Sequence, residues 1–359
     1  MESPRVVVGM SGGVDSSVTA ALLKEQGYQV IGMTLRLWSE EHLGLDNRCC
    51  TTDAVGDARS IAGQLQIPHY TVDAKQIFHD TVVSAFIEGY QKGITPNPCL
   101  TCNRHIRWGF MYQRARALGA DYMATGHYAR LLENRNGKVQ LLKGVDPDKD
   151  QSYVLYMLSQ DDLRHTLLPL GGYTKNEVRR MAEEFQLPAA HRPDSQDLCF
   201  LGGDDYRDFL LRNQPAVHHP GPILDTEGEK LGEHQGLAFF TIGQRKGLGI
   251  SPPRPHYVLG KDPERNALLV GTRDELGQTS LQARDVQWVS GSAPEAPFQA
   301  EIKIRYTAPA REGTVTPRPD QKAEVQFPEP LRDITPGQAA VFYQGEVCLG
   351  GGIIQGTSP

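Results

Sequence analysis

The chain has 359 residues and a formal net charge of −6 at pH 7, and 39% of its residues are hydrophobic. This length exceeds the roughly 100 to 200 residues of a typical domain, so it predicts two or three domains that each bury a core. The amino terminus MESPRVVVGM lacks the charged flank and long apolar stretch of a signal peptide, and no later run approaches the ~18 apolar residues of a membrane span. We therefore expect a cytoplasmic protein with no membrane partner. The net negative charge argues mildly against nonspecific binding to nucleic acid.

Residues 5–205 alternate short apolar runs with helical patterns. This alternation is typical of an α/β fold, a doubly wound parallel sheet covered by helices. The first strands are expected at 5–9, 28–37 and 69–74, with helices at 16–25 and 53–64. A helix at 106–118 and a strand at 122–126 are expected next. Thr174 and Glu177 have the spacing of a capping box that opens a further helix through residue 184.

After residue 205 the pattern changes. Beyond a helical run at 205–214, helical periodicity largely ends, and glycine- and proline-rich turns recur at short intervals. Apolar runs on either side of residues 261–265 predict a hairpin, and later apolar runs predict further strands. We therefore expect a catalytic, nucleotide-binding domain at 1–205 and two small, mainly β domains at 206–280 and 281–359. The boundary near residue 280 rests on turn spacing alone.

A glycine-rich loop directly follows the first expected strand. It reads Met10-Ser11-Gly12-Gly13-Val14-Asp15-Ser16-Ser17 and leads into a helical pattern. A strand, a glycine turn and a helix start present backbone N–H groups and the positive end of a helix dipole to an anion, so the loop predicts a phosphate cradle. It matches neither the Walker A spacing GxxxxGK[ST] nor the dinucleotide fingerprint GxGxxG. In the alternative interpretation it is a plain turn in which Asp15 and Ser16 cap the helix.

Three residues near this loop have chemistry or positions that suit a nucleotide. The Asp15 carboxylate suits Mg²⁺ on the phosphates, because this hard ion prefers carboxylate and phosphate oxygens. Leu35 and Gly126 fall at the ends of expected strands, where ligands of open α/β sheets gather. Taken alone, Leu35 is more often a core residue, so it enters only through the resemblance described below.

Six cysteines are too few for a disulfide scaffold in a chain of this length. Cys99 and Cys102 form a C-x-x-C motif just before a helix that we expect to begin near Arg104. A thiol at a helix start beside Arg104 and Arg107 is expected to have a lowered pKa. Cys102 is therefore a candidate nucleophile.

Cys199 lies at the end of the α/β part, where a strand could return it to the same crevice. Alone, a single cysteine before Phe-Leu is usually a small buried hydrophobe. Structural zinc at the C-x-x-C motif is an alternative, but the sequence offers only His105 and the distant Cys199 as further ligands. Three cysteines match no usable ligand spacing and are expected to be structural or incidental: Cys49, Cys50 and Cys348.

Motifs along the whole chain resemble those of the tRNA-specific 2-thiouridylases, which are ATP pyrophosphatases. In chain order they are GMSGGVDSSV, TPNPCLTCNRHIRW, ATGHYA, DKDQSYVLY, RPDSQDLCF, FTIGQRKGLGI and VFYQGEVCLGGGII. The resemblance implies an ATP pyrophosphatase domain, a small central domain and a C-terminal β-barrel. It also implies that ATP adenylylates the C2 oxygen of a wobble uridine in tRNA, after which sulfur displaces AMP.

The resemblance assigns roles to residues by motif position. Cys199 would receive a persulfide from a sulfur-donor protein, either a cysteine desulfurase or a sulfur-relay protein, and Cys102 would be the nucleophile that releases the sulfur. The nucleotide would contact Gly9, Met10, Ser11, Gly12, Gly13, Val14, Asp15, Ser16, Leu35 and Gly126. The tRNA would contact Asn97, Pro98, Cys99, His127, Lys149, Asp150, Gln151, Arg305, Tyr306 and Gln344.

One position departs from the family pattern, because many members have Asp where this chain has Cys99. Cys99, Cys102 and Cys199 could then hold a [4Fe-4S] cluster with one open iron, whose sulfide would replace the persulfide. We favour the persulfide route. Two rival functions are an amide-forming ligase of the same superfamily, which needs neither Cys102 nor Cys199, and a noncatalytic tRNA- or cluster-binding protein with a relic nucleotide loop.

Overall fold

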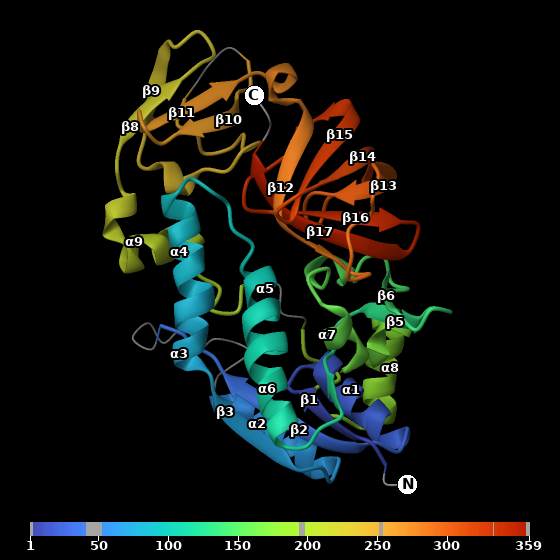
Figure 1. Ribbon diagram of the computed structural model, residues 1–359. Helices are drawn as coiled ribbons and strands as arrows, with labels where there is room; N and C mark the ends of the chain where they lie inside the picture. Colours follow the sequence, from blue (N-terminus) through green and yellow to red (C-terminus); the bar gives the residue numbers. More distant parts are fainter. Residues whose placement is uncertain (1–2, 41–51, 194–197, 251–253, 333, 357–359) are drawn as a thin grey trace.

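The computed structural model describes residues 3–40, 52–193, 198–250, 254–332 and 334–356. Figure 1 shows three parts: a helix-covered sheet nearest the amino terminus, a small β-rich part and a C-terminal barrel. Cys49 and Cys50, expected to be incidental thiols, lie outside the described residues. In the part of the chain that the structure describes, no helix is long and apolar enough to cross a membrane.

A parallel sheet forms the first part, as the sequence predicts. In the described residues its strand order is β3-β2-β1-β4-β7, and every neighbouring pair is parallel. Side chains alternate between the two faces of β1, so Val6 and Val8 pack against α1 and α8, while Val7 packs with Trp108 and Met111 on the opposite face. Helices on both faces confirm the doubly wound arrangement. The strands are β1 (Arg5–Gly9), β2 (Gln29–Arg36), β3 (His69–Asp73), β4 (Tyr122–Ala124) and β7 (Thr166–Leu167).

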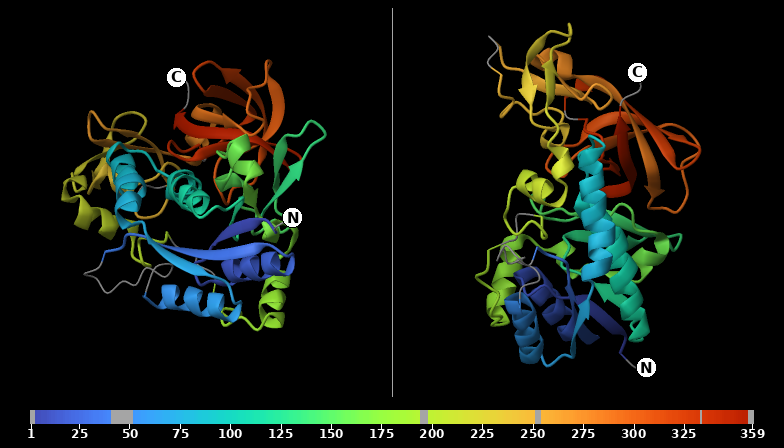
Figure 2. Two further views of the ribbon diagram at one scale, coloured as in Figure 1. Left: turned by 60° about the horizontal axis from the view of Figure 1, so that its bottom comes forward. Right: turned by 90° about the vertical axis from the view of Figure 1, so that its left-hand side faces the viewer.

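The first part also contains two long, continuous helical stretches at 75–91 and 98–117, each with a π-helical segment in it. Figure 2 shows these stretches side by side, running from the sheet toward the β-rich parts. The second one begins at Pro98, several residues before the expected start near Arg104, because Asn97 caps it through a bond from the Cys99 N–H. The helices are α1 (Val14–Glu25), α2 (Thr52–Gln64), α3 (Lys75–Phe78), η2 (His79–Val83), α4 (Ser84–Gln91), α5 (Pro98–Thr101), η3 (Cys102–Met111), α6 (Tyr112–Ala117), η4 (Ser152–Val154), α7 (Gln160–Arg164), η5 (Pro169–Gly172) and α8 (Lys175–Glu184).

The central part begins with α9 (Tyr206–Asn213) and continues into a small mixed sheet of order β10-β11-β8-β9. Its core is shared with the first part, because Phe209 and Val258 belong to one apolar cluster with Phe86 of α4. The expected hairpin is present as β10 and β11. The remaining elements are η6 (Pro215–Val217), β8 (Gly221–Leu224), β9 (Lys230–His234), η7 (Leu237–Phe239), β10 (Tyr257–Asp262), β11 (Ala267–Gly271) and η8 (Arg273–Leu276).

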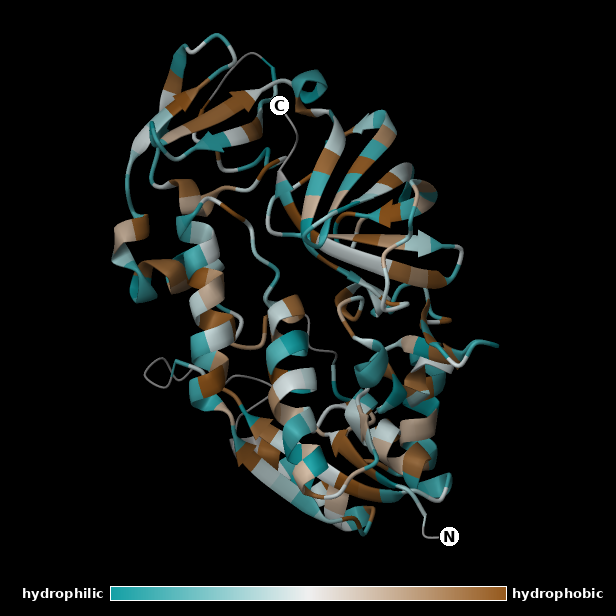
Figure 3. Cartoon of the chain, viewed as in Figure 1, coloured by the Kyte–Doolittle hydropathy of each residue, from teal (hydrophilic) through white to brown (hydrophobic). Residues whose placement is uncertain are grey.

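The C-terminal part is a closed antiparallel barrel. Its strands follow the order β12-β15-β14-β13-β16-β17, and pairing of β17 with β12 closes the ring. Apolar and polar bands alternate along the strands (Figure 3), which is the pattern of a barrel with side chains packed inside. This closure confirms the β-barrel implied by the resemblance. The strands are β12 (Gln278–Trp288), β13 (Phe298–Lys303), β14 (Arg311–Arg318), β15 (Lys322–Leu331), β16 (Ala339–Gln344) and β17 (Val347–Gly356).

A hairpin from the first part joins the barrel sheet, which the sequence analysis did not foresee. It consists of β5 (Ala129–Glu133) and β6 (Val139–Lys143), and β6 pairs with β17 through Leu141 and Cys348. Two ion pairs accompany the strand pairing, Arg130 with Glu346 at 3.1 Å and Lys143 with Glu301 at 3.3 Å. The barrel is thereby attached to the first part by backbone as well as side-chain contacts.

Candidate nucleotide and thiol sites

The loop between β1 and α1 is shaped by a glycine that no other residue could replace without strain. Gly12 has a φ of +75°, and a Cβ there would lie 2.8 Å from the carbonyl oxygen of Ala54. The Ser11 N–H donates to the Ser16 hydroxyl at 3.2 Å, which folds the loop back over the helix start. Backbone conformation and close packing together fix the predicted cradle.

The start of α1 carries no side-chain cap. Its N-cap is Gly13, and within the described residues no side chain bonds to the orphan N–H groups as a cap. The hydroxyls of Ser16 and Ser17 instead donate to the Gly13 carbonyl at 3.2 and 2.7 Å. The alternative interpretation, in which Asp15 and Ser16 cap this helix, is therefore wrong, and in the described residues the backbone N–H groups of the helix start have no side-chain cap.

Two other strand ends meet at this loop. Gly126 follows β4, and a Cβ there would come within 3.0 Å of Asp15, so the backbone can approach α1 only because the side chain is absent. Leu35 lies near the carboxyl end of β2 and packs at the edge of two apolar clusters. Gly9, Leu35 and Gly126 thus sit at neighbouring strand ends, where ligands of this fold class bind.

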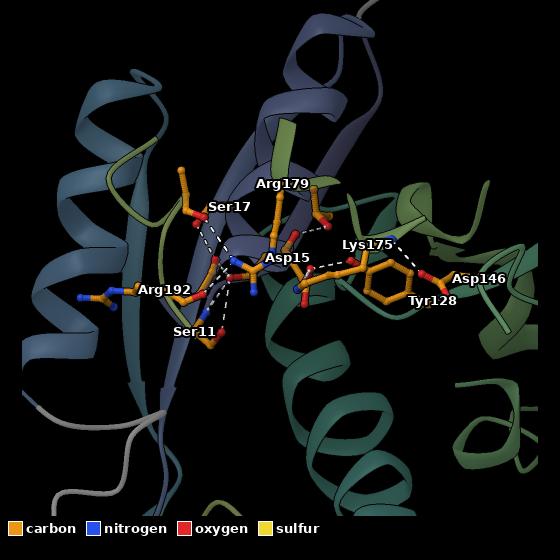
Figure 4. A network of polar contacts seen from close by, with 12 residues as sticks. Ser11, Asp15, Ser17, Tyr128, Asp146, Lys175, Arg179 and Arg192 are labelled. Carbon is orange, nitrogen blue, oxygen red and sulfur yellow. Dashed lines mark hydrogen bonds and ion pairs between the residues drawn. The ribbon is translucent and has the colours of Figure 1, made fainter. Parts of the chain in front are cut away.

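Asp15 is held by two donors that lie far away in the sequence. The Tyr128 hydroxyl and the Lys175 ammonium both contact its Oδ1 atom at 2.7 Å (Figure 4). The other oxygen, Oδ2, accepts no hydrogen bond from any residue that the structure describes, and 35% of the Asp15 side chain is exposed. Asp15 is therefore oriented but still open to a further ligand, which fits its expected role toward Mg²⁺.

Lys175 was missed by the sequence analysis. It is the first residue of α8, where Thr174 and Glu177 form the predicted capping box. A lysine in this position is itself a signal, because a cation at the positive end of a helix is unfavourable unless an anion lies nearby.

A second cation contacts the loop from another side. Arg192 donates to the Gly12 carbonyl at 3.2 Å and pairs with Asp57 of α2. Arg179 of α8 in turn donates to the Arg192 carbonyl at 3.1 Å, as Figure 4 shows. The segment that follows α8 is thus fastened across the glycine loop.

The C-x-x-C motif lies inside the helical stretch 98–117 and not in front of it, so the expected placement of Cys102 was wrong. Cys99 is in the first turn and Cys102 one turn further along. Cys99 reaches solvent, yet the surrounding protein desolvates its thiolate and raises the pKa of the thiol to about 11, with Cys102 adding to the shift and Arg107 opposing it.

Cys102 and Cys199 lie at the edge of the same apolar cluster, which contains Phe86 and Phe200. The structure therefore brings the two predicted sulfur-handling residues to one region. Among the described residues, no three His, Cys, Asp or Glu side chains group closely enough to hold a metal ion. The three cysteines in this conformation do not fit an iron–sulfur cluster, and we derive no step through one.

Two of the residues expected to contact tRNA can be compared by their burial. Tyr306 is 36% exposed and its ring lies 6.1 Å from that of Tyr153, and desolvation raises the pKa of its hydroxyl, with Asp150 and Cys99 adding to the shift. Asp150 is buried and accepts hydrogen bonds from Gly144 and Ser152 at 3.0 Å. Asp150 thus holds the segment from Gly144 to Ser152 together through these two backbone hydrogen bonds.

The other expected tRNA contacts differ in exposure. His127 is buried, bonds to Thr125 at 2.8 Å, and has a pKa lowered well below its usual value by desolvation and by Arg107. Arg305 donates to the Ile242 carbonyl and to Thr335, which joins barrel and central part. Asn97 and Pro98 lie at the start of the helical stretch 98–117, and Lys149 is half-buried. The Gln151 side chain accepts a hydrogen bond from the Tyr128 N–H at 3.0 Å. Gln344 is exposed and lines a cavity of about 490 Å³ together with Trp288 and Phe298.

Three family models match successive parts of the chain. Residues 4–203 match the tRNA methyl transferase HUP domain, residues 207–272 the tRNA methyl transferase PRC-barrel domain and residues 278–354 the aminomethyltransferase beta-barrel domain. The first match alone covers more than half of the chain.

Full-length relatives agree with these matches. The tRNA-specific 2-thiouridylase MnmA of Moorella thermoacetica is 48% identical over 355 residues, covering 98% of this chain and 99% of the relative. The protein of the same name from Roseiflexus castenholzii is 48% identical over 366 residues with the same coverage. A solved 4-thiouridine synthetase–RNA complex with bound ATP has a TM-score of 0.35 and 17% identity, too distant to support an argument.

Proposed function

Because this chain belongs to the tRNA-specific 2-thiouridylase family, we propose that it adenylylates the C2 oxygen of a wobble uridine in tRNA and replaces that oxygen with sulfur from a cysteine persulfide. Family membership makes the chain an ATP-dependent tRNA sulfurtransferase. The wobble position, the adenylylated oxygen and the persulfide are the parts that we propose.

The adenylylation step is supported by the glycine loop. The uridine C2 oxygen attacks the α-phosphorus of ATP, the bond to the β-phosphate breaks, and pyrophosphate leaves with the bonding electron pair. Residues 9–16 offer N–H groups of an uncapped helix start to that leaving group, and Leu35 and Gly126 border the nucleotide. Asp15 would hold Mg²⁺, which supplies positive charge to the phosphates when bound.

The sulfur step is supported by the placement of both Cys102 and Cys199 at the edge of one apolar cluster. The terminal sulfur of a Cys199 persulfide attacks C2, the C2–O bond breaks, and AMP leaves with the electron pair. The Cys102 thiolate then attacks the Cys199 sulfur, and the sulfur–sulfur bond to the uridine breaks to leave the thiocarbonyl. The products are 2-thiouridine and a Cys102–Cys199 disulfide, which an external dithiol reduces. A persulfide donor protein reloads Cys199.

The tRNA is proposed to lie over the surface near Cys99. Cys99 and Tyr306 are both exposed, and Gln151 is bonded to Tyr128, whose hydroxyl reaches Asp15. Contacts at 97–99, His127, 149–151, Arg305, Tyr306 and Gln344 would then flank both the nucleotide and the thiols. Unpaired loop bases are commonly held by such aromatic and amide side chains.

The function is tested with iron-free protein, Mg²⁺, ATP, a persulfide donor and tRNA that lacks the thio group. We expect pyrophosphate, AMP and thiolated uridine in equal amounts, with Asp15→Asn abolishing all three while its melting temperature stays near that of the parent. Product that forms only after iron and sulfide are restored would refute the persulfide. Full activity of Asp15→Asn would refute the assignment of the nucleotide loop, and ATP cleavage without thiolation would favour the amide-forming ligase.

A further inference from the structure

Two prolines stiffen the connection that leads to the thiol-bearing helix. The segment between α4 and the helical stretch 98–117 ends in Thr95-Pro96-Asn97-Pro98. A residue that precedes proline is restricted to extended conformations, and proline has no N–H with which to continue a helix. Asn97 is accordingly extended, with a φ of −109° and a ψ of 97°, and it caps the helix. A shift of Thr95 is therefore passed on to the start of the helix that carries Cys102.

The C-terminal barrel holds both backbone polar groups of Thr95. The Thr95 N–H donates to the Pro336 carbonyl at 3.0 Å, and the Thr95 carbonyl accepts from Gln338 Nε2 at 2.9 Å. Gly337 has a φ of +94°, and a Cβ there would collide with Ile94 and lie 2.8 Å from the Thr95 carbonyl oxygen. The barrel can approach this segment, which passes from α4 to α5 in Figure 1, because Gly337 has no side chain.

The barrel loop 335–338 is itself fixed, and it lies beside an expected tRNA contact. The Gly337 N–H donates to the Ile354 carbonyl at 2.9 Å, and the Ile354 N–H donates to the Gln338 carbonyl at 2.8 Å, so the loop is attached to β17. Arg305, which is expected to contact tRNA, bonds to Thr335 of the same loop. The loop therefore joins the barrel surface proposed for tRNA to the start of the thiol-bearing helix.

We propose that Gln338, together with Gly337, is a positioning residue for the release of sulfur. The barrel loop sets the start of the helical stretch 98–117 and thereby the place of Cys102 relative to Cys199. This inference rests on the proposed function, in which the Cys102 thiolate attacks the Cys199 sulfur and frees the thiolated uridine. Attack of one sulfur on another requires close alignment, and a displacement of about 1 Å can slow such a step about 100-fold. Gln338 acts through Thr95, so its effect falls on this step.

The test follows the intermediate in which tRNA is joined to Cys199 by a disulfide. A single turnover is run without external dithiol, using Mg²⁺, ATP, tRNA and protein that carries the persulfide. AMP release reports formation of the intermediate, and loss of the covalent tRNA–protein adduct on a denaturing gel reports attack by Cys102. Gln338→Met removes the amide donor and keeps the length of the side chain. We expect AMP release within about 2-fold of the parent rate and adduct decay at least about 10-fold slower.

Matched variants control for the loss of an amide and for a change of backbone. The Gln64 amide on α2 also donates to backbone carbonyls, those of Phe185 and Gln186, and Gln64→Met should leave both rates at the parent value. Gly337→Ala should slow adduct decay as Gln338→Met does, because it pushes on the same segment. Gly228→Ala, with a φ of +86° and no atom within 4 Å of the added Cβ, should not.

The outcomes separate this inference from the proposed function. Adduct decay at the parent rate in Gln338→Met, or in Gly337→Ala should the first variant not fold, would overturn the positioning role. An equal slowing of AMP release and adduct decay would also overturn it, because a general structural defect affects both steps. Cys102→Ser should accumulate the adduct. If it forms none, the proposed sulfur route is refuted together with this inference, whereas accumulation in Cys102→Ser with parent decay in Gln338→Met refutes the inference alone.

Discussion

The nucleotide loop and the C-x-x-C motif both use the start of a helix, with opposite results. At α1 the N–H groups of the helix start have no side-chain cap in the described residues, and we propose that they bind an anion. At the helix that begins at Pro98, the thiol in the first turn has a pKa raised to about 11. A helix dipole contributes roughly 0.3 to 1 kcal/mol, which is less than one pKa unit, whereas desolvation shifts a pKa by several units.

The comparison teaches that a helix start does not by itself activate a thiol. Whether the helix dipole or desolvation dominates the pKa of a thiol depends on how much protein surrounds that thiol. An anion that arrives from solvent would gain from the dipole at α1, but the protein around Cys99 removes part of the hydration of its thiolate. The following experiments test this contrast, in order of decreasing effect.

Replacing the two cysteines that we propose to carry sulfur should abolish thiolation while leaving nucleotide binding intact. Cys102→Ser and Cys199→Ser are each expected to lower thiolation at least ~10³-fold, because a hydroxyl neither carries sulfane sulfur nor attacks it. ATP affinity, measured by calorimetry, should stay within about 2-fold. Substantial thiolation by either variant would exclude the two-cysteine route, and a parallel loss of ATP affinity would show that the regions are not separable.

The reactivity of Cys99 measures the effect of desolvation directly. With a pKa of about 11, its thiolate fraction at pH 8 should be roughly 100-fold below that of the unfolded chain, and alkylation should slow by a similar factor. Iodoacetamide labelling from pH 7 to 11, followed by peptide mass analysis, gives the profile. A midpoint of the labelling profile below pH 9 would mean that the helix dipole lowers the pKa of Cys99 more than desolvation raises it.

Cys99→Ser separates the two sulfur carriers. We expect it to retain substantial thiolation with a persulfide donor, within about 10-fold of the parent, because the proposed transfer uses Cys102 and Cys199. Liquid chromatography of digested tRNA provides the measurement. Complete loss of product by Cys99→Ser, together with its loss of the iron and acid-labile sulfide that anaerobically reconstituted parent protein holds, would favour a cluster.

Gly12→Ala should damage the nucleotide region through its backbone. A side chain there would adopt a φ of +75° and press against the Ala54 carbonyl, so ATP affinity should fall about 10-fold. The matched control is Gly27→Ala, which also has positive φ but no atom within 4 Å of the added Cβ, and ATP affinity should not change. Equal ATP affinities of Gly12→Ala and Gly27→Ala would show that the close packing at Gly12 does not matter for ATP binding.

Cys348→Ala is expected to have the smallest effect on activity. Its thiol is buried, and burial raises the pKa to about 12, so the residue acts as a small core side chain. Thiolation should stay within about 2-fold while stability falls by about 1 kcal/mol in a denaturant titration. If the Cys348→Ala variant is fully folded under the assay conditions and still loses most of its thiolation activity, Cys348 has a chemical role.

The sequence predicted the doubly wound sheet and the glycine turn between β1 and α1 well, because both depend on residues close together along the chain. Strand, glycine turn and helix start occur in one continuous run from Arg5 to Ser17. Contacts between distant residues were missed. Nothing local shows that Lys175 reaches Asp15, although its place at a helix start was a usable signal.

Two other misses have local causes. The β5–β6 hairpin turns at Asn136 and Gly137, a pair typical of hairpins, which the sequence analysis overlooked. The helical stretch that contains Cys102 begins at Pro98, earlier than expected, because Asn97 caps it. An asparagine followed by a proline is a recognised start signal, and it lies ahead of the start expected near Arg104. The raised pKa of Cys99 had no sequence signal, because desolvation depends on what packs around the thiol.

The pairing of β6 with β17 also has a consequence for the order in which the protein is made. Among the described strands β6 pairs with β5 and with β17, which is synthesised long after it, so a nascent chain on the ribosome must carry that second edge of β6 unpaired through synthesis of the central part and most of the barrel. An unpaired strand edge is prone to join a neighbouring chain, and pairings between distant segments form slowly. Completion of the barrel therefore also ends the period in which the newborn chain is most prone to aggregate.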